Sequence, residues 1–178
     1  MNLITRYDIQ LFYWLYGKMT ERSCVWVRLI SKTGDGHIYL LLAFFLWAFE
    51  PDNGALFLYT GLLAYGLELP LFVILKKLFK RQRPCDIFNN FNAFVEPSDK
   101  FSLPSGHTTA AFLMASLLAN FYPDVTGIVY LWASTVGLSR VLLGVHYPTD
   151  IIAGALLGLT ISFLSCLLYT SPSPRDGI

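Results

Sequence analysis

Residues 149–169 read TDIIAGALLGLTISFLSCLLY, and the only charge in this stretch is the carboxylate of Asp150, near its beginning. A helix that crosses a bilayer needs roughly 20 consecutive, predominantly apolar residues. The segment therefore predicts a membrane-spanning helix. Its glycines Gly154 and Gly158 form a small-residue surface on which a neighbouring helix can pack closely.

The composition of the whole chain agrees with this interpretation. Of its 178 residues, 54% are hydrophobic and only 14% are charged, whereas soluble domains carry about 25% charged residues. The formal net charge of +1 gives no basic surface for nucleic acid. The three cysteines are widely separated and lack a metal-binding spacing, so we expect free thiols.

The same length criterion, applied to the rest of the chain, predicts four more spanning helices. They cover residues 24–49, 55–79, 105–121 and 124–143. Residues 3–19 combine apolar residues at helical spacing with charged ones, which favours an amphipathic helix in the membrane interface; a short sixth span is the alternative. The predicted fold is an all-α, polytopic transmembrane helix bundle with five main spans plus this N-terminal helix.

We expect residues 1–170 to form a single membrane-embedded domain, which the chain length suits. Residues 171–178 change abruptly in character and resemble translated vector or adapter sequence, so we expect a non-native or disordered tail. Residues 80–103 are polar and irregular and form the longest predicted loop. Loops on a rigid scaffold often carry function.

Three polar segments interrupt the apolar helices at related places. They are Lys76-x6-Arg83-Pro84, Pro104-Ser105-Gly106-His107 and Ser139-Arg140-x5-His146-x3-Asp150. Spans joined by short connections alternate in direction, so the end of the second span, the start of the third, the end of the fourth and the start of the fifth share one membrane face. All three segments lie at those points, and the topology is predicted to bring them together.

The residue types in these segments suit a phosphate. Phosphoryl transfer needs charge neutralised on the phosphate oxygens, an in-line nucleophile and an acid for the leaving oxygen. Arg83 and Arg140 offer planar forks for bidentate phosphate binding, and Lys76 would act as a point charge. Ser105 precedes an apolar helical run whose first N–H groups can bind an anion, and Gly106 allows the phosphate to approach the backbone closely.

Two histidines complete the candidate site. His107 lies in the first turn of that helix, toward the same anion. Asp150 follows His146 by four residues, so its carboxylate can accept a hydrogen bond from one imidazole nitrogen and leave the other free to attack phosphorus. The same spacing would also permit metal ligation, but few further ligands are at hand.

Other charged residues near the spans have more than one interpretation. Glu68 lies within the second span, and an intramembrane carboxylate either makes structural hydrogen bonds or lines a substrate cavity. Lys77, Lys80 and Arg81 directly follow that span, where cations are usually interface anchors.

Together, the three segments resemble the type 2 phosphatidic acid phosphatases, which share a site with vanadium haloperoxidases. The pattern of that family is KxxxxxxRP, then PSGH, then SRxxxxxHxxxD, and all three occur here in order and without substitution over residues 76–150. The resemblance covers most of residues 24–169, and the five predicted spans fit the helical core of the family.

The resemblance implies a role for each residue of the pattern. His146 is the nucleophile that forms a phosphohistidine, Asp150 orients it, and His107 protonates the leaving oxygen and then activates water. The phosphate oxygens are held by Lys76, Arg83, Ser105, Gly106, His107 and Arg140. No metal or other cofactor is implied.

The predicted function is that of an integral-membrane lipid phosphate phosphatase of a bacterial inner membrane. Candidate substrates are undecaprenyl diphosphate, phosphatidylglycerol phosphate and phosphatidic acid; no nucleic acid and no particular protein partner is indicated. Bacterial members of the family usually place the site at the periplasmic face, and we follow them, although the positive-inside rule taken literally would put it in the cytoplasm. A lipid phosphotransferase and a non-catalytic anion-binding membrane protein are the alternatives.

Overall fold

The computed structural model describes residues 3–87, 93–97 and 99–170, and within them all regular secondary structure is helical. The helices are α1 (Leu3–Tyr16), α2 (Glu21–Lys32), α3 (Gly36–Phe49), α4 (Gly54–Phe79), α5 (Pro84–Ile87), α6 (Gly106–Phe121), the short 3-10 helix η1 (Pro123–Val125), α7 (Thr126–Leu142) and α8 (Pro148–Thr170). The all-α prediction is confirmed. The predicted tail at 171–178 lies outside the described residues.

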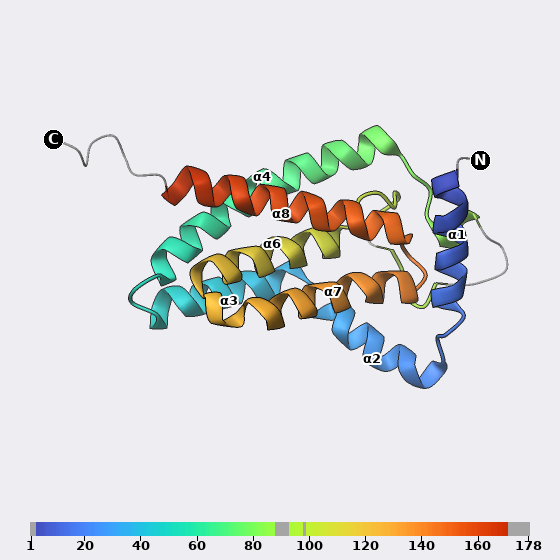
Figure 1. Ribbon diagram of the computed structural model, residues 1–178, viewed down its shortest axis with the longest axis horizontal. Helices are drawn as coiled ribbons and strands as arrows, with labels where there is room; N and C mark the ends of the chain where they lie inside the picture. Colours follow the sequence, from blue (N-terminus) through green and yellow to red (C-terminus); the bar gives the residue numbers. More distant parts are fainter. Residues whose placement is uncertain (1–2, 88–92, 98, 171–178) are drawn as a thin grey trace.

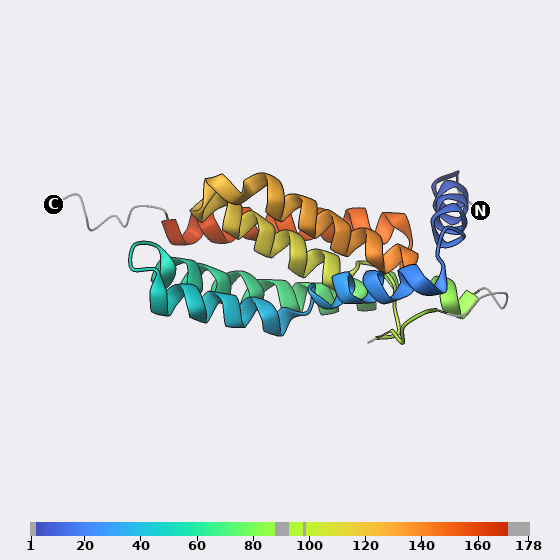
Figure 2. The same cartoon turned by 90° about the horizontal axis from the view of Figure 1, so that it is seen from below.

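The long helices form a bundle with α6 at its centre. Helices α3, α4, α6, α7 and α8 lie side by side, and α6 packs against the other four (Figure 1). Helix α1 lies crosswise over one end of the bundle, where it contacts α7 and α8 (Figures 1 and 2). That crosswise position is the one an interfacial amphipathic helix would take.

Three of the described helical stretches are long and apolar enough to cross a membrane, namely Gly54–Ile87, Pro123–Leu142 and Pro148–Leu168. Helix α3 is a shorter apolar helix. Large apolar side chains project outward from the bundle, among them Leu41 and Phe163, which are 68% and 67% exposed. An exposed apolar exterior of this extent suits contact with lipid.

The predicted single span over 24–49 is wrong, because the chain breaks between α2 and α3 at residues 33–35. Gly34 lies in this break against α7, where an added Cβ would be 2.7 Å from Cγ1 of Val136. Asp35 takes an extended backbone conformation (φ −76°, ψ 127°) and begins α3. The break turns α2 out of line with α3, and α2 packs against α7.

The closest helix packing joins α6 to α8, as the two glycines of α8 predict. A Cβ at Gly158 would lie 2.3 Å from the carbonyl oxygen of Thr109 and 2.8 Å from the amide nitrogen of Leu113. At Gly154 it would lie 2.7 Å from the carbonyl oxygen of Ser105. This contact fixes the beginning of α6 beside the beginning of α8.

Candidate active site

The three polar segments meet at the end of the bundle that α1 covers. The C-terminal ends of α4 and α7 and the N-terminal ends of α6 and α8 all lie there (Figure 1). The alternating direction of the helices predicts this arrangement. Asp150 accepts a backbone hydrogen bond from the N–H of Ser105 through its carbonyl oxygen at 3.1 Å, which ties two of the segments together directly.

Arg83 joins the first segment, to which it belongs, to the third. It is buried, and its Nη1 donates to the carbonyl oxygen of Val145 at 2.8 Å and lies 3.2 Å from Nε2 of His146. Its Nη2 donates to Oδ1 of Asp99 at 2.7 Å. The guanidinium therefore lies between the imidazole and an acidic residue that is not part of any of the three segments.

Asp99 also pairs with Lys76, whose Nζ lies 2.5 Å from the same Oδ1 and donates to the carbonyl oxygen of Phe101 at 2.7 Å. Burial by itself would raise the pKa of Asp99, but the hydrogen bond from Lys76 and the charges of Lys76 and Arg83 bring it below its usual value. One carboxylate oxygen thus occupies a position between the two cations, where a phosphate oxygen could make the same contacts.

His146 is buried between opposite charges. Its Nδ1 lies 3.5 Å from Oδ2 of Asp150, an ion-pair distance longer than a formed hydrogen bond, and no other described residue hydrogen-bonds this atom. Burial lowers the pKa of His146 to about 4; Arg83 and Arg140 act in the same direction and Asp150 opposes them. The neutral imidazole therefore predominates near neutral pH, and its Nε2 faces the guanidinium of Arg83.

Arg81 binds Oδ1 of Asp150, the carboxylate oxygen that does not face His146. Its Nη1 donates to Oδ1 of Asp150 at 2.7 Å and to Oγ1 of Thr149 at 2.7 Å, and its Nη2 pairs with Asp8 of α1. Asp8 in turn accepts a hydrogen bond from the backbone N–H of Thr149 at 3.0 Å. The guanidinium lies over the ring of Tyr147, 4.1 Å from its centroid. Helix α1 is thereby linked to the residue predicted to orient the nucleophile.

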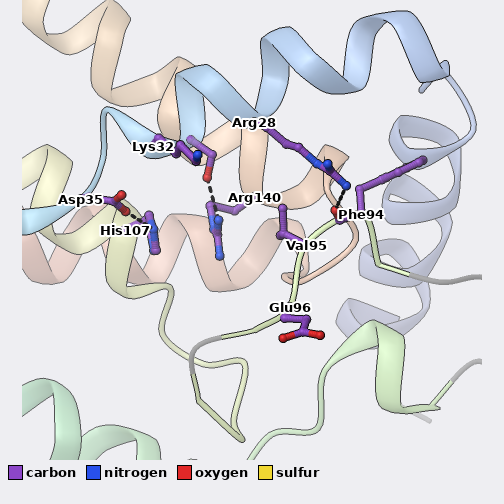
Figure 3. A pocket seen from close by; sticks show the side chains of 9 residues that line it. Arg28, Lys32, Asp35, Phe94, Val95, Glu96, His107 and Arg140 are labelled. Atoms are coloured by element: carbon purple, nitrogen blue, oxygen red, sulfur yellow. Dashed lines mark hydrogen bonds and ion pairs between the residues drawn. The ribbon is translucent and has the colours of Figure 1, made fainter.

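His107 and Arg140 line a separate polar cavity of about 360 Å³ under α2 (Figure 3). Nε2 of His107 lies 3.0 Å from Oδ1 of Asp35, and Nη1 of Arg140 donates to Oγ of Ser31 at 2.6 Å. Arg140 is 5% exposed, and its Nε has no hydrogen-bond partner among the described residues. A buried donor without a partner is costly, and an anion in the cavity would relieve that cost.

The beginning of α6 has the form expected of an anion site. Ser105 is the N-cap, its backbone is extended, and its Oγ accepts a hydrogen bond from Oγ1 of Thr108 at 2.9 Å. Gly106 lies against the ring of Phe72, where an added Cβ would be 2.8 Å from Cζ. The small residue is therefore required by packing as well as by any approach of a phosphate.

Glu68 is buried on α4, at 3% exposure. An apolar cavity of about 260 Å³ between α3 and α4 is lined by its neighbours Tyr65 and Leu69 and not by Glu68 itself. Its role in a substrate cavity stays a prediction. Over residues 3–87, 93–97 and 99–170, no three His, Cys, Asp or Glu side chains form a group that could hold a metal ion.

The sequence patterns missed four residues that the structure brings to the site: Asp8, Asp35, Arg81 and Asp99. Arg81 was interpreted as an interface anchor. A usable indication was present for Asp8, because it shares a helical face with Phe12, and both side chains are buried. A carboxylate on the buried face of an amphipathic helix needs a cation nearby, and Arg81 is that cation.

The family model of the PAP2 superfamily matches residues 53–172, more than half of the chain. The bacitracin transport permease protein BcrC of Bacillus licheniformis is 29% identical over 126 residues, which cover 71% of this chain and 61% of BcrC. Phosphatidylglycerophosphatase B of Bacillus subtilis (strain 168) is 37% identical over 114 residues, covering 58% of this chain and 53% of that protein.

Solved structures show the same architecture. LpxE of Aquifex aeolicus superposes with a TM-score of 0.78 at 28% sequence identity, covering 88% of this chain and 93% of LpxE. The chain spans less than two thirds of the length of the two curated relatives above. Its apolar helices and these matches identify an integral membrane protein.

Proposed function

The chain belongs to the PAP2 superfamily, the type 2 phosphatidic acid phosphatases, and from that premise we propose that it is an integral-membrane lipid phosphate phosphatase. The observation that carries the proposal is the placement of His146. Its Nε2 lies 3.2 Å from Nη1 of Arg83, and its Nδ1 faces Asp150. A neutral imidazole held between a carboxylate and phosphate-binding cations is arranged for nucleophilic attack.

In the first step, Nε2 of His146 attacks phosphorus in line with the ester oxygen. The N–P bond forms, the P–O bond to the lipid breaks, and the leaving oxygen takes a proton from His107. Asp150 stabilises the positive charge that develops on the imidazole. Lys76, Arg83 and Arg140, with the N–H groups at the start of α6, neutralise the equatorial phosphate oxygens.

In the second step, water attacks the phosphohistidine. His107 accepts a proton from the water, the N–P bond breaks, and inorganic phosphate leaves with His146 returned to its neutral form. His107 must be protonated in the first step and neutral in the second. Burial and the charge of Arg140 disfavour the protonated form, and the contact with Asp35, 3.0 Å from Nε2 to Oδ1, opposes them.

The substrate in this proposal is an amphiphile whose phosphate lies at the end of the bundle and whose hydrocarbon chains enter between the helices. Undecaprenyl diphosphate, phosphatidylglycerol phosphate and phosphatidic acid all have this form. We place the protein in a bacterial inner membrane with the site toward the periplasm. Cys85 follows Arg83 closely and is partly exposed, so an impermeant maleimide should label it in intact cells, and Cys85→Ser should remove that labelling.

Phosphate release from a panel of lipid phosphates by the purified full chain in detergent tests the activity. We expect turnover that survives EDTA and is blocked by vanadate, which mimics pentacoordinate phosphorus. His146→Ala should lower kcat by at least about 10⁴-fold, whereas His37→Ala, at an exposed histidine of α3, should leave it unchanged.

Three results would contradict the proposal. Turnover by folded His146→Ala at the wild-type rate would exclude His146 as the nucleophile. Transfer of the phosphoryl group to an added alcohol in preference to water would indicate a phosphotransferase. Tight vanadate binding without phosphate release from any lipid would indicate a non-catalytic anion-binding protein.

A further inference from the structure

The polar cavity under α2 contains cations that the family pattern does not include. Its lining comes from α2, from the segment before Asp99, and from the two pattern residues His107 and Arg140 (Figure 3). The lining residues of α2 are Arg28, Ser31 and Lys32, and Asp35 lies in the break that follows α2. Positions i, i+3 and i+4 lie on one helical face, and this face of α2 borders the cavity.

Some of the charged side chains that line this cavity already have hydrogen-bond partners, and others do not. Arg28 donates to the carbonyl oxygen of Phe94, while none of the described residues hydrogen-bonds or ion-pairs with the side-chain ammonium of Lys32. Of the two carboxylates, Asp35 is engaged by His107, and Glu96 lies on the loop side of the cavity, across from α2 (Figure 3). The α2 side of the cavity is therefore cationic, and Arg140 of α7, whose Nε has no hydrogen-bond partner among the described residues, also lines the cavity.

The position of His107 determines which part of a substrate would enter the cavity. In an in-line displacement the leaving group departs on the side opposite the nucleophile. His107, the proposed proton donor to the leaving oxygen, lines the cavity. The group attached to that oxygen should therefore occupy it.

The lining of a second, apolar cavity begins at the next residue of the chain after Asp35. Asp35 lines the polar cavity, and the next residue, Gly36, lines the apolar cavity between α3 and α4. That second cavity has a volume of about 260 Å³ and is bordered by aromatic and aliphatic side chains, among them Tyr39, Phe57 and Leu62. A polar and an apolar cavity at the Asp35–Gly36 junction suit an anionic group and the lipid chain attached to it.

We propose that Arg28 and Lys32 form an anion subsite for a second phosphate, the one that stays on the lipid when the terminal phosphate is removed. The substrate class is then a lipid diphosphate. This inference rests on the proposed phosphatase function and extends it. The terminal phosphate binds Lys76 and Arg83, and the inner phosphate binds the face of α2.

A matched pair of substrates tests the subsite: a C15 prenyl diphosphate and the corresponding prenyl monophosphate, in the same detergent micelles. The wild type should have the higher kcat/KM for the diphosphate. Lys32→Ala should lower the ratio of kcat/KM for diphosphate over monophosphate by about tenfold, the effect of one charge-assisted hydrogen bond, and Lys32→Arg should restore it. Arg22→Ala removes a cation from the same helix at a position that does not line the cavity, and the ratio should not change.

The failures of the two proposals are distinguishable. Loss of both activities in equal proportion in Lys32→Ala would overturn the subsite and leave the phosphatase function standing, as would a wild-type preference for the monophosphate. Because Arg28 also holds Phe94, Arg28→Ala serves only as the second variant, and the ratio rather than the rate is again the measure. A wild type that releases phosphate from neither substrate, nor from any other lipid phosphate, would overturn the phosphatase function and the subsite with it.

Discussion

Replacing Arg81 with methionine should impair both folding and catalysis, although Arg81 lies outside the family pattern. The substitution keeps much of the side-chain volume and removes the cation between Asp8 and Asp150. Those two carboxylates are 1% and 0% exposed, while the Arg81 side chain is 24% exposed. Without Arg81, the carboxylates of Asp8 and Asp150 would stay buried with no cation between them. Asp8 would keep its hydrogen bonds from the backbone N–H and the hydroxyl of Thr149.

The size of the stability loss depends on the hydrogen bonds that each carboxylate retains. Removing one partner of a buried ion pair typically costs about 3–5 kcal/mol. Asp150 retains the hydrogen bond from the backbone N–H of Tyr147 at 2.8 Å, and Asp8 retains both bonds from Thr149. Arg81 is also partly solvated. We therefore expect the lower end of the range, about 3 kcal/mol, which for a chain of this size corresponds to a fall in Tm of about 6–12 °C.

The catalytic effect should be separate from the loss of stability. Asp150 would no longer be held by Arg81, and misplacement of a positioning group by about 1 Å can cost about 10²-fold in rate. We expect kcat to fall by about that factor with a smaller change in KM, measured below the Tm of the variant. Lys77→Met is the control, because it removes an exposed cation from the same region and should change neither quantity.

The double variant Arg81→Met with Asp8→Asn isolates the charge effect. Removing the Asp8 charge leaves a single unpaired carboxylate, so the double variant should be more stable than Arg81→Met alone, and the two substitutions should be non-additive. Thermal unfolding in detergent and phosphate release provide the two readouts. A folded Arg81→Met protein with unchanged Tm and unchanged kcat would refute the assignment of Arg81 as a positioning residue.

Four further outcomes are expected. Since burial lowers the pKa of His146 to about 4 from an ordinary 6.5, kcat/KM should stay level down to about pH 5 and fall only near pH 4, and an acid limb near 6.5 would contradict this. Between about pH 4 and pH 6.5, His146 is protonated in the unfolded chain and neutral in the folded one. The contribution of His146 to the free energy of unfolding should therefore be complete above about pH 6.5 and be lost as the pH falls toward 4. Asp99→Asn removes the carboxylate between two phosphate-binding cations, so vanadate should inhibit about fivefold more strongly; weaker inhibition would show that Asp99 supports the site instead of competing for it. Gly158→Ala should cost about 1–3 kcal/mol by forcing α6 and α8 apart, whereas Gly66→Ala, with no neighbour within 4 Å of the added Cβ, should not lower the Tm; equal effects would contradict the packing account.

The long apolar helices could be predicted because their requirement is local. A run such as residues 149–169 has to be helical in lipid to satisfy its own backbone hydrogen bonds, whatever it contacts. The break at residues 33–35 could not be predicted in this way. It depends on Val136, roughly a hundred residues further along the chain, against which Gly34 packs, and hydropathy alone does not report such a contact.

The candidate site likewise has a part that could be predicted from the sequence and a part that could not. The three polar segments lie at helix ends whose common face follows from alternating direction, so their meeting could be predicted. The function of Arg81 could not, because its partner Asp8 is 73 positions away and comes from a helix that lies crosswise to the bundle. The pairing is a property of how α1 docks, and that docking is not encoded in the residues around Arg81.

The acidic residues outside the pattern have a common physical origin. A site for a dianionic phosphate needs an excess of cations, and before substrate arrives those cations lie close together in a poorly solvated place, which is unfavourable unless counterions are supplied. Asp99 is the counterion of Lys76 and Arg83, and Asp8 is a counterion of Arg81. The two differ in exposure, since the side chain of Asp99 is 36% exposed on a connecting segment and that of Asp8 is 1% exposed on the buried face of α1. We therefore expect the Asp99 contacts to exchange for phosphate oxygens during turnover, while the Asp8 contact persists, because Arg81 pairs with Asp150 and not with Asp99.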